Sequence, residues 1–197
     1  MRYTRIPETA FQNLQLNAGV LLSDFNPATG TVDETDIMGA TSGGVAFAAT
    51  PEFSDFGEDI DNCPVNVLEL KRLDSWEVTM SGTFITVSTT LVKDLVGAAD
   101  IDGSDPTKVV PRNDVATTDF KDIWWVGDYS DKNGETKGGF VAIHMLNGLS
   151  TGGFQLQSGN REKGQFEFEF TGHYSINAQD TVPFEVYVKA GTDEEEA

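Results

Sequence analysis

Apolar and polar residues alternate with a period of two through most of this chain. The clearest case is residues 165–170, where three phenylalanines alternate with Gln165, Glu167 and Glu169. Successive side chains of a strand point to opposite faces, so we expect the phenylalanines to be buried and the other three to face water. The same pattern recurs at residues 14–20, 76–80, 141–145 and 182–188, and shorter apolar runs lie at 44–49, 123–126 and 154–157. The pattern predicts a mainly β chain with at least five half-buried strands.

One segment has helical spacing instead. Leu91, Val92, Leu95 and Val96 recur as on one face of a helix, Ser88 can cap the first turn, and Gly97 can close the end in a left-handed conformation. The sequence therefore predicts an antiparallel β-sandwich with one flanking α-helix at about residues 88–97. We expect one domain over residues 1–190, with turns at 131–134 and 151–153, and a solvated acidic tail at 191–197.

Two long stretches, residues 24–43 and 51–74, lack clear periodicity and are acidic. Loops of this length in a compact domain usually carry a function or reach a neighbouring molecule.

The charge is strongly one-sided, with 13 Lys and Arg against 32 Asp and Glu and a formal charge of −19. Residues 6–70 contain 11 acids and no Lys, Arg or His. Gripping a nucleic acid or an anionic membrane needs a basic patch, so composition disfavours both partners. No apolar run is long enough to cross a bilayer, and the opening residues lack the apolar stretch of a secretory signal, so we expect the chain to stay where it is translated.

Catalytic and metal-binding motifs are weak. No Gly-x-Ser-x-Gly turn or phosphate-binding loop occurs, and His144 and His173 lie in strand-like segments, which favours structural roles. Cys63, the only cysteine, has no cation near it in sequence to activate its thiol. Residues 100–105 fail as a calcium loop, because Asp105 and Pro111 stand where glycine and glutamate are required. The acidic loop 55–61 could hold a hard cation but is more typical of a solvated surface. We therefore expect no catalytic residue, no metal and no cofactor.

Two alternatives stay open from the residues alone. Trp124 and Trp125 should point to opposite faces, so one of them could stack on a sugar in an acidic carbohydrate-binding module. The simpler interpretation is that one tryptophan anchors the core and the other an interface. An enzyme such as a glycosidase would need a carboxylate pair, and nothing singles out a pair among the acids.

Several segments, in order, resemble the major tail tube proteins of long-tailed bacteriophages. They are residues 11–20, 39–47, 51–60, 75–84, 122–127, 138–144 and 166–174. The resemblance implies a structural virion protein, not an enzyme, with a β-sandwich, a flanking helix and long assembly loops. It implies hexameric rings stacked into a hollow tail tube for DNA ejection into the host cell, in a non-contractile phage or prophage, with assembly in the host cytoplasm.

The partners that the resemblance implies are further copies of the chain and the tape-measure, tail terminator and baseplate or distal tail proteins. DNA would pass through without specific binding. A tail terminator or a sheath-contacting tube protein of similar fold is a close alternative within the same class.

Two hypotheses connect this function with residues. Part of the acidity of residues 6–70, or the face of Gln165, Glu167 and Glu169, would line the lumen and repel DNA. Residues 51–74 would form an arm that stacks ring on ring, with contact candidates Phe53, Phe56, Asp59, Asp61 and Leu68.

Overall fold

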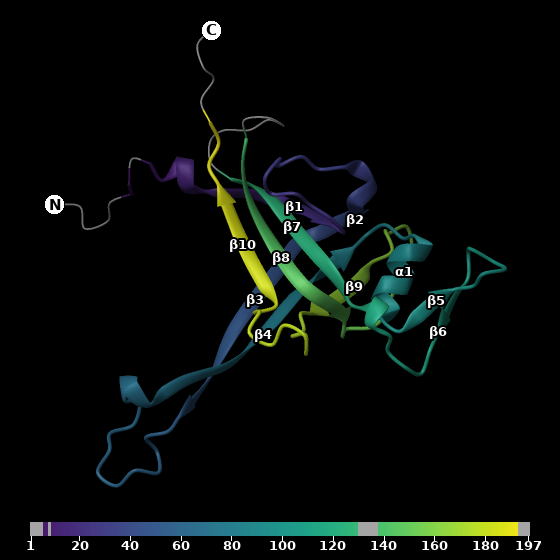
Figure 1. Cartoon of the computed structure of the whole chain (residues 1–197). Helices are drawn as coiled ribbons and strands as arrows, with labels where there is room; N and C mark the ends of the chain where they lie inside the picture. Colours follow the sequence, from purple (N-terminus) through teal and green to yellow (C-terminus); the bar gives the residue numbers. More distant parts are fainter. Residues whose placement is uncertain (1–5, 8, 130–137, 193–197) are drawn as a thin grey trace.

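The computed structural model describes residues 6–7, 9–129 and 138–192. Eight of its strands form one antiparallel sheet in the order β2-β1-β7-β8-β9-β4-β3, with β10 also paired to β8 (Figure 1). These strands are β1 (Gln15–Leu22), β2 (Ile37–Gly39), β3 (Thr41–Asp55), β4 (Lys71–Phe84), β7 (Lys121–Tyr129), β8 (Gly139–Ser150), β9 (Phe166–Thr171) and β10 (Phe184–Lys189). A second sheet pairs β5 (Ala99–Ile101) with β6 (Val109–Pro111). The predicted mainly β, antiparallel fold is confirmed.

The large sheet folds into two packed layers. Layer A contains β1, β2, β7, β8 and β10, and layer B contains β3, β4 and β9. The end of β8 joins them, because Leu149 and Ser150 pair with Thr171 and Phe170 of β9. The sheet is open rather than a closed barrel, since β2 and β3 end the order without pairing to each other among the described residues.

The main core lies between the inner faces of the layers. It is built from Val78, Met80 and Phe84 of β4, the three phenylalanines of β9, Leu21, Ile123 and Met145 of layer A, and Leu91 and Leu95 of the helix. The rings of Phe84 and Phe168 lie 4.5 Å apart between centroids. The strand alternation predicted for residues 165–170 is therefore confirmed.

A smaller core covers part of the outer face of layer A. The loop after β1 places Phe25 edge-on against Trp124 and Phe140, with ring centroids 5.6 and 5.3 Å apart. Leu22 and Ala142 complete this cluster. Strand β8 is thus buried on both faces over part of its length.

The predicted helix is α1 (Thr89–Val96), one residue shorter at each end than expected. The Ser88 hydroxyl accepts a hydrogen bond from the Leu91 N–H at 3.1 Å, as expected for a capping serine. Gly97 follows with φ 82° and ψ −67°, so its φ is positive as predicted but its ψ lies outside the left-handed helical region. The described residues also contain four short 3₁₀ turns: η1 (Phe11–Asn13), η2 (Glu34–Asp36), η3 (Leu68–Leu70) and η4 (Thr117–Asp119).

The burial predicted for residues 14–20 is only partly confirmed: Leu16 and Val20 are half-buried, but Ala18 is exposed. Leu14 is exposed, whereas Leu21 and Leu22, on opposite faces, are both fully buried. The cause is a bulge between Leu16 and Val20, where Asn17 and Gly19 have φ of 64° and 70°. A Cβ on Gly19 would lie 2.5 Å from the Trp125 ring, so glycine is needed for space as well as for φ.

Other expected boundaries also differ. Residues 154–157 form no strand and contribute only an isolated bridge from Gln157 to Gln165. Strand β10 begins at Phe184 rather than 182. Two stretches expected to be irregular contain strands: residues 24–43 contain β2 and the beginning of β3, and residues 51–74 contain the end of β3 and the beginning of β4. The turn predicted at 131–134 and the tail residues 193–197 lie outside the described residues.

The packing predicts that Phe84 is essential to stability. Phe84→Ala removes a fully buried ring and leaves a cavity against Phe168, and we expect it to lower the free energy of unfolding by about 3–5 kcal/mol. Chemical denaturation of the purified chain measures this. Leu68→Ala, at a position 84% exposed, is the matched control and should change stability little. A loss from Phe84→Ala no larger than from the control would contradict the assigned core.

Candidate functional site

The most distinctive surface is an arm, residues 51–74, that projects from the two layers (Figure 1). It is the far half of the β3–β4 hairpin: Phe53 pairs with Leu73 and Asp55 with Lys71. The expectation that this segment lacks strands is therefore wrong, although it does form an arm. Its tip, residues 56–70, contains no strand and ends in the 3₁₀ turn η3.

Asp55 organises the tip. Its carboxylate accepts hydrogen bonds from the Gly57 N–H at 2.9 Å and the Asn66 N–H at 2.7 Å. These two bonds, with Lys71 nearby, hold the pKa of Asp55 below its ordinary value of 3.8. Lys71 also donates to the Asn66 side chain at 2.8 Å. The tip is thus a structured turn.

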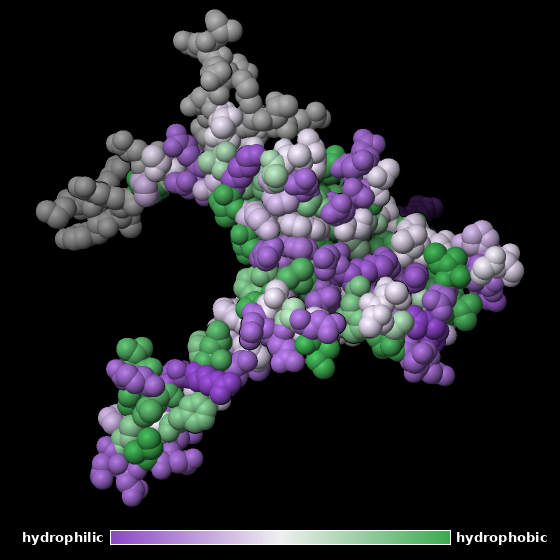
Figure 2. Space-filling view, viewed as in Figure 1, coloured by the Kyte–Doolittle hydropathy of each residue, from purple (hydrophilic) through white to green (hydrophobic). Residues whose placement is uncertain are grey.

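The arm exposes many apolar side chains, and Figure 2 shows them along its length at lower left. Those that are at least two-fifths exposed are Phe53, Phe56, Ile60, Val65, Leu68 and Leu73. All five contact candidates from the sequence lie on this arm and are exposed: Phe53, Phe56, Asp59, Asp61 and Leu68. Several large apolar side chains exposed on one projecting hairpin are typical of a protein–protein contact.

The outer face of layer B is polar and lacks cations. Glu167 and Glu169 are exposed on β9, opposite Thr83 and Ser81 of β4. The three strands contain no Lys or Arg over residues 41–50, 75–84 and 166–171. A shallow groove of about 470 Å³ runs between the two glutamates and β4. The structure thus unites Glu167 and Glu169 on one acidic face.

The acids of residues 6–70 do not share one surface. One group lies in the loop after β1, where Asp24, Asp33, Glu34 and Asp36 line a hollow. The other group lies on the arm. The structure therefore separates the two regions that the sequence joined in one acidic run.

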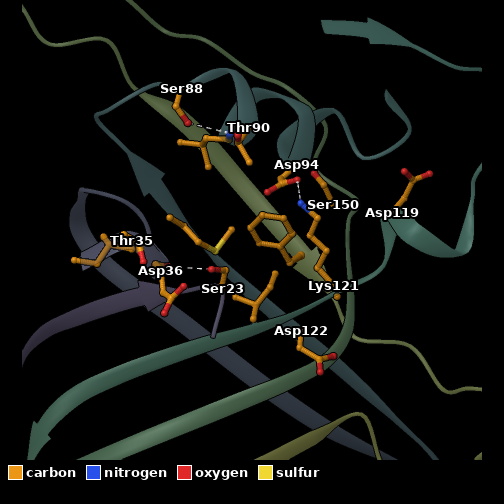
Figure 3. A pocket seen from close by; sticks show the side chains of 16 residues that line it. Ser23, Thr35, Asp36, Ser88, Thr90, Asp94, Asp119, Lys121, Asp122 and Ser150 are labelled. Carbon is orange, nitrogen blue, oxygen red and sulfur yellow. Dashed lines mark hydrogen bonds and ion pairs between the residues drawn. The ribbon is translucent and has the colours of Figure 1, made fainter. Parts of the chain in front are cut away.

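A cavity of about 440 Å³ lies beside α1, at the ends of β7 and β8 (Figure 3). Four aspartates line it, but three of them have partners. Asp94 pairs with Lys121, Asp119 forms two hydrogen bonds with Arg112 at 2.6 and 2.7 Å, and Asp122 accepts the Asn147 N–H at 3.0 Å.

The partners of Asp119 decide its ionisation. Burial favours the neutral form, but the Ala116 N–H and the Arg112 guanidinium outweigh it and lower the pKa of this carboxyl. Asp119 is therefore unsuited to act as the proton donor of a glycosidase. This cavity gives the enzyme alternative no support.

The tryptophans pack in opposite directions. Trp124 is buried and stacks flat on His144, with centroids 3.8 Å apart and planes 6° apart. Trp125 is partly buried on the inner face, and its indole N–H donates to the Ala18 carbonyl at 3.0 Å. One face of Trp124 is thus already covered by the chain itself, which weakens the carbohydrate-binding alternative.

The histidines have the surroundings of structural residues. His144 lies between two carboxylates, 3.4 Å from Asp122 and 3.5 Å from Glu185. A hydrogen bond from Tyr187 is the main cause that lowers the pKa of Glu185, and His144 adds to it. His173 lies 3.2 Å from the Asn147 carbonyl and edge-on to Phe120.

The remaining candidates stay unremarkable. Residues 102–105 form a turn in which Asp102 accepts bonds from Ser104 and Lys108, which lower its pKa to about 2. Cys63 is half-buried at the arm tip, and its thiol points to the Pro64 carbonyl. Among the described residues no group of three or more His, Cys, Asp and Glu is placed to hold a metal ion. No helix in the same part of the chain is long and apolar enough to cross a membrane.

Sequence reasoning missed two features of the surface. Val186 and Val188 of β10 were assigned to a buried strand face but are 51% and 61% exposed. The extra residue Asp74 in β4 was also missed. Its signal is a change of parity, because the apolar residues of β4 are even-numbered from Trp76 onward, whereas Leu73 is odd.

The tip geometry predicts a specific effect of Asp55→Ala. At neutral pH this change should speed hydrogen exchange of the Gly57 and Asn66 amides on the order of tenfold, because both lose a charged acceptor. In the unmodified chain the same protection should be lost as the pH falls through the lowered pKa of Asp55, below 3.8. Asp61→Ala, for which no such bond occurs among the described residues, is the control. Unchanged exchange in Asp55→Ala would contradict the structure of the tip.

Comparison with models of known protein families and with curated proteins finds no match for this chain.

Proposed function

We propose that this chain is a structural subunit of the major tail tube type, which assembles into rings that stack as a hollow tube for DNA. The observation that carries the proposal is the arm: a structured hairpin that holds six large apolar side chains in water beyond the body of its own chain. Such exposure costs free energy in a monomer and is relieved when a second molecule covers it.

Free strand edges support ring formation. Among the described residues β3 pairs only with β4, and β10 pairs only with β8. Residues 37–50, which include most of β3, carry no charge and no proline. Edge strands of monomers usually carry charges or prolines that prevent pairing, so a long uncharged edge is better suited to pairing with another subunit.

The acidic outer face of layer B supports the role of a conduit. A wall with Glu167, Glu169 and hydroxyls but no cation offers DNA phosphates no ion pair, and repulsion acts over roughly 8–10 Å in physiological salt. We propose that this face lines the bore. In the same proposal the other partners are tape-measure, terminator and distal tail proteins, the location is the virion tail, and the chain is not an enzyme.

The arm is tested by a double substitution. Phe56→Ser with Leu68→Asp should abolish hollow rods in negative-stain images of concentrated protein. The two changes remove exposed apolar side chains that, in this proposal, hold one ring on the next. Stability to denaturant should stay within about 0.5 kcal/mol of the unmodified chain, as is usual for surface changes. Val115→Asp, at an exposed valine outside the arm, is the control and should leave rods intact. Normal rods from the double variant would refute the role of the arm.

The acidic face is tested by charge reversal. Glu167→Lys with Glu169→Lys should slow DNA ejection from assembled particles and make it more dependent on salt, because lysines would bind phosphates along the bore. The control Glu162→Lys with Asp180→Lys makes the same change of charge at exposed positions outside layer B. Equal ejection rates for both variants, with normal tubes, would show that β9 does not face the lumen.

A further inference from the structure

A bulge in β4 adds Leu73 to the apolar face of the arm. Ser75 pairs with Glu52 but Leu73 pairs with Phe53, so Asp74 is an extra residue at the base of the arm. A bulge of this kind shifts the following side chains to the other face of the strand. Leu73 therefore joins Phe53 on the side of β3 that faces the core in the body of the chain.

Side chains from both strands secure this bulge. Ser54 donates a hydrogen bond to Asp74, and Ser75 donates to Glu52 at 2.7 Å. Just above, the Trp76 N–H donates to the Tyr174 hydroxyl at 3.0 Å. The inner, apolar face of layer B thus continues into the arm, beyond the part that layer A covers.

Layer A also extends past its partner layer. In β10, Val186 and Val188 lie on the same face of the strand as Phe184, because alternate residues share a face. Phe184 packs on Phe47 and Trp76 in the core. Yet Val186 and Val188 are 51% and 61% exposed. Each layer therefore has an inner apolar face that the other layer leaves uncovered, and Figure 2 shows the molecule hollowed between the arm and the body.

We propose that the arm of one copy of this chain lies on the uncovered β10 face of a second copy. Both surfaces continue the inner, apolar faces of the two layers. In the contact, each copy would bury the part of a layer that the other copy leaves exposed. Since the two surfaces differ, the contact is head-to-tail, and a head-to-tail contact can repeat from one ring to the next, as a stack requires. The inference rests on the proposed tube and names the surface that receives the arm.

The single cysteine of the chain provides a direct test. Cys63 lies at the arm tip, so Val188→Cys or Val186→Cys adds a thiol on the proposed receiving face. Under mild oxidation of concentrated protein we expect a ladder of disulfide-linked multimers, because each copy carries one arm and one receiving face. Val115→Cys is the control for random oxidation, and Val188→Cys with Cys63→Ser is the control for contacts between β10 faces.

A second measurement does not depend on thiol geometry. Val186→Asp with Val188→Asp should remove rods while leaving the denaturation midpoint of the monomer unchanged. A ladder no stronger than that of Val115→Cys, or normal rods from the double aspartate variant, overturns the inference. A ladder from protein that never forms rods upholds the contact and contradicts the tube, so the two proposals fail separately.

Discussion

The structure depends on one constraint: the apolar face of a β-sheet must be covered. Layer B continues past layer A as the arm, and layer A continues past layer B at β10. Within the shared area the phenylalanines of β9 and the side chains of β4 are buried as in any domain core. Outside it, equally apolar side chains are left in water. The offset between the layers, and not a chemical motif, is what distinguishes this chain.

The charge of the chain limits how copies can meet. At −19 each, two copies repel one another, and the arm itself carries seven acids and two cations over residues 51–74. In the proposed assembly, apolar contact and strand-edge pairing would therefore supply the attraction, while salt reduces the repulsion between exposed acids. This division fits the surface: apolar side chains lie on the arm and on β10, and the cation-free face of layer B is left for solvent or a polyanion.

The sequence predicts those features that depend on neighbouring residues. The alternation in β9, the capping of α1 by Ser88 and the opposite packing of Trp124 and Trp125 all follow from local spacing.

The wrong predictions occur where a bulge changes which face of a strand the following side chains occupy. In β1, a bulge with two positive-φ residues makes Leu21 and Leu22 the fully buried positions. In β4, the extra residue Asp74 interrupts the alternation, so the strand at the base of the arm was not recognised. The exposure of Val186 and Val188 could not be predicted from alternation, because it depends on how far a distant layer extends. Phe53, Phe56, Asp59, Asp61 and Leu68 all lie exposed on the arm, and their role in contacts between copies stays a prediction.

The most direct measurement is an electron cryomicroscopy reconstruction of the assembled protein. The account predicts a continuous central bore lined by the outer face of β9, with Glu167 and Glu169 toward the axis and the arm of each copy seated on its neighbour. A solid filament, a bore lined by arginines and lysines, or arms left free in solvent would contradict it.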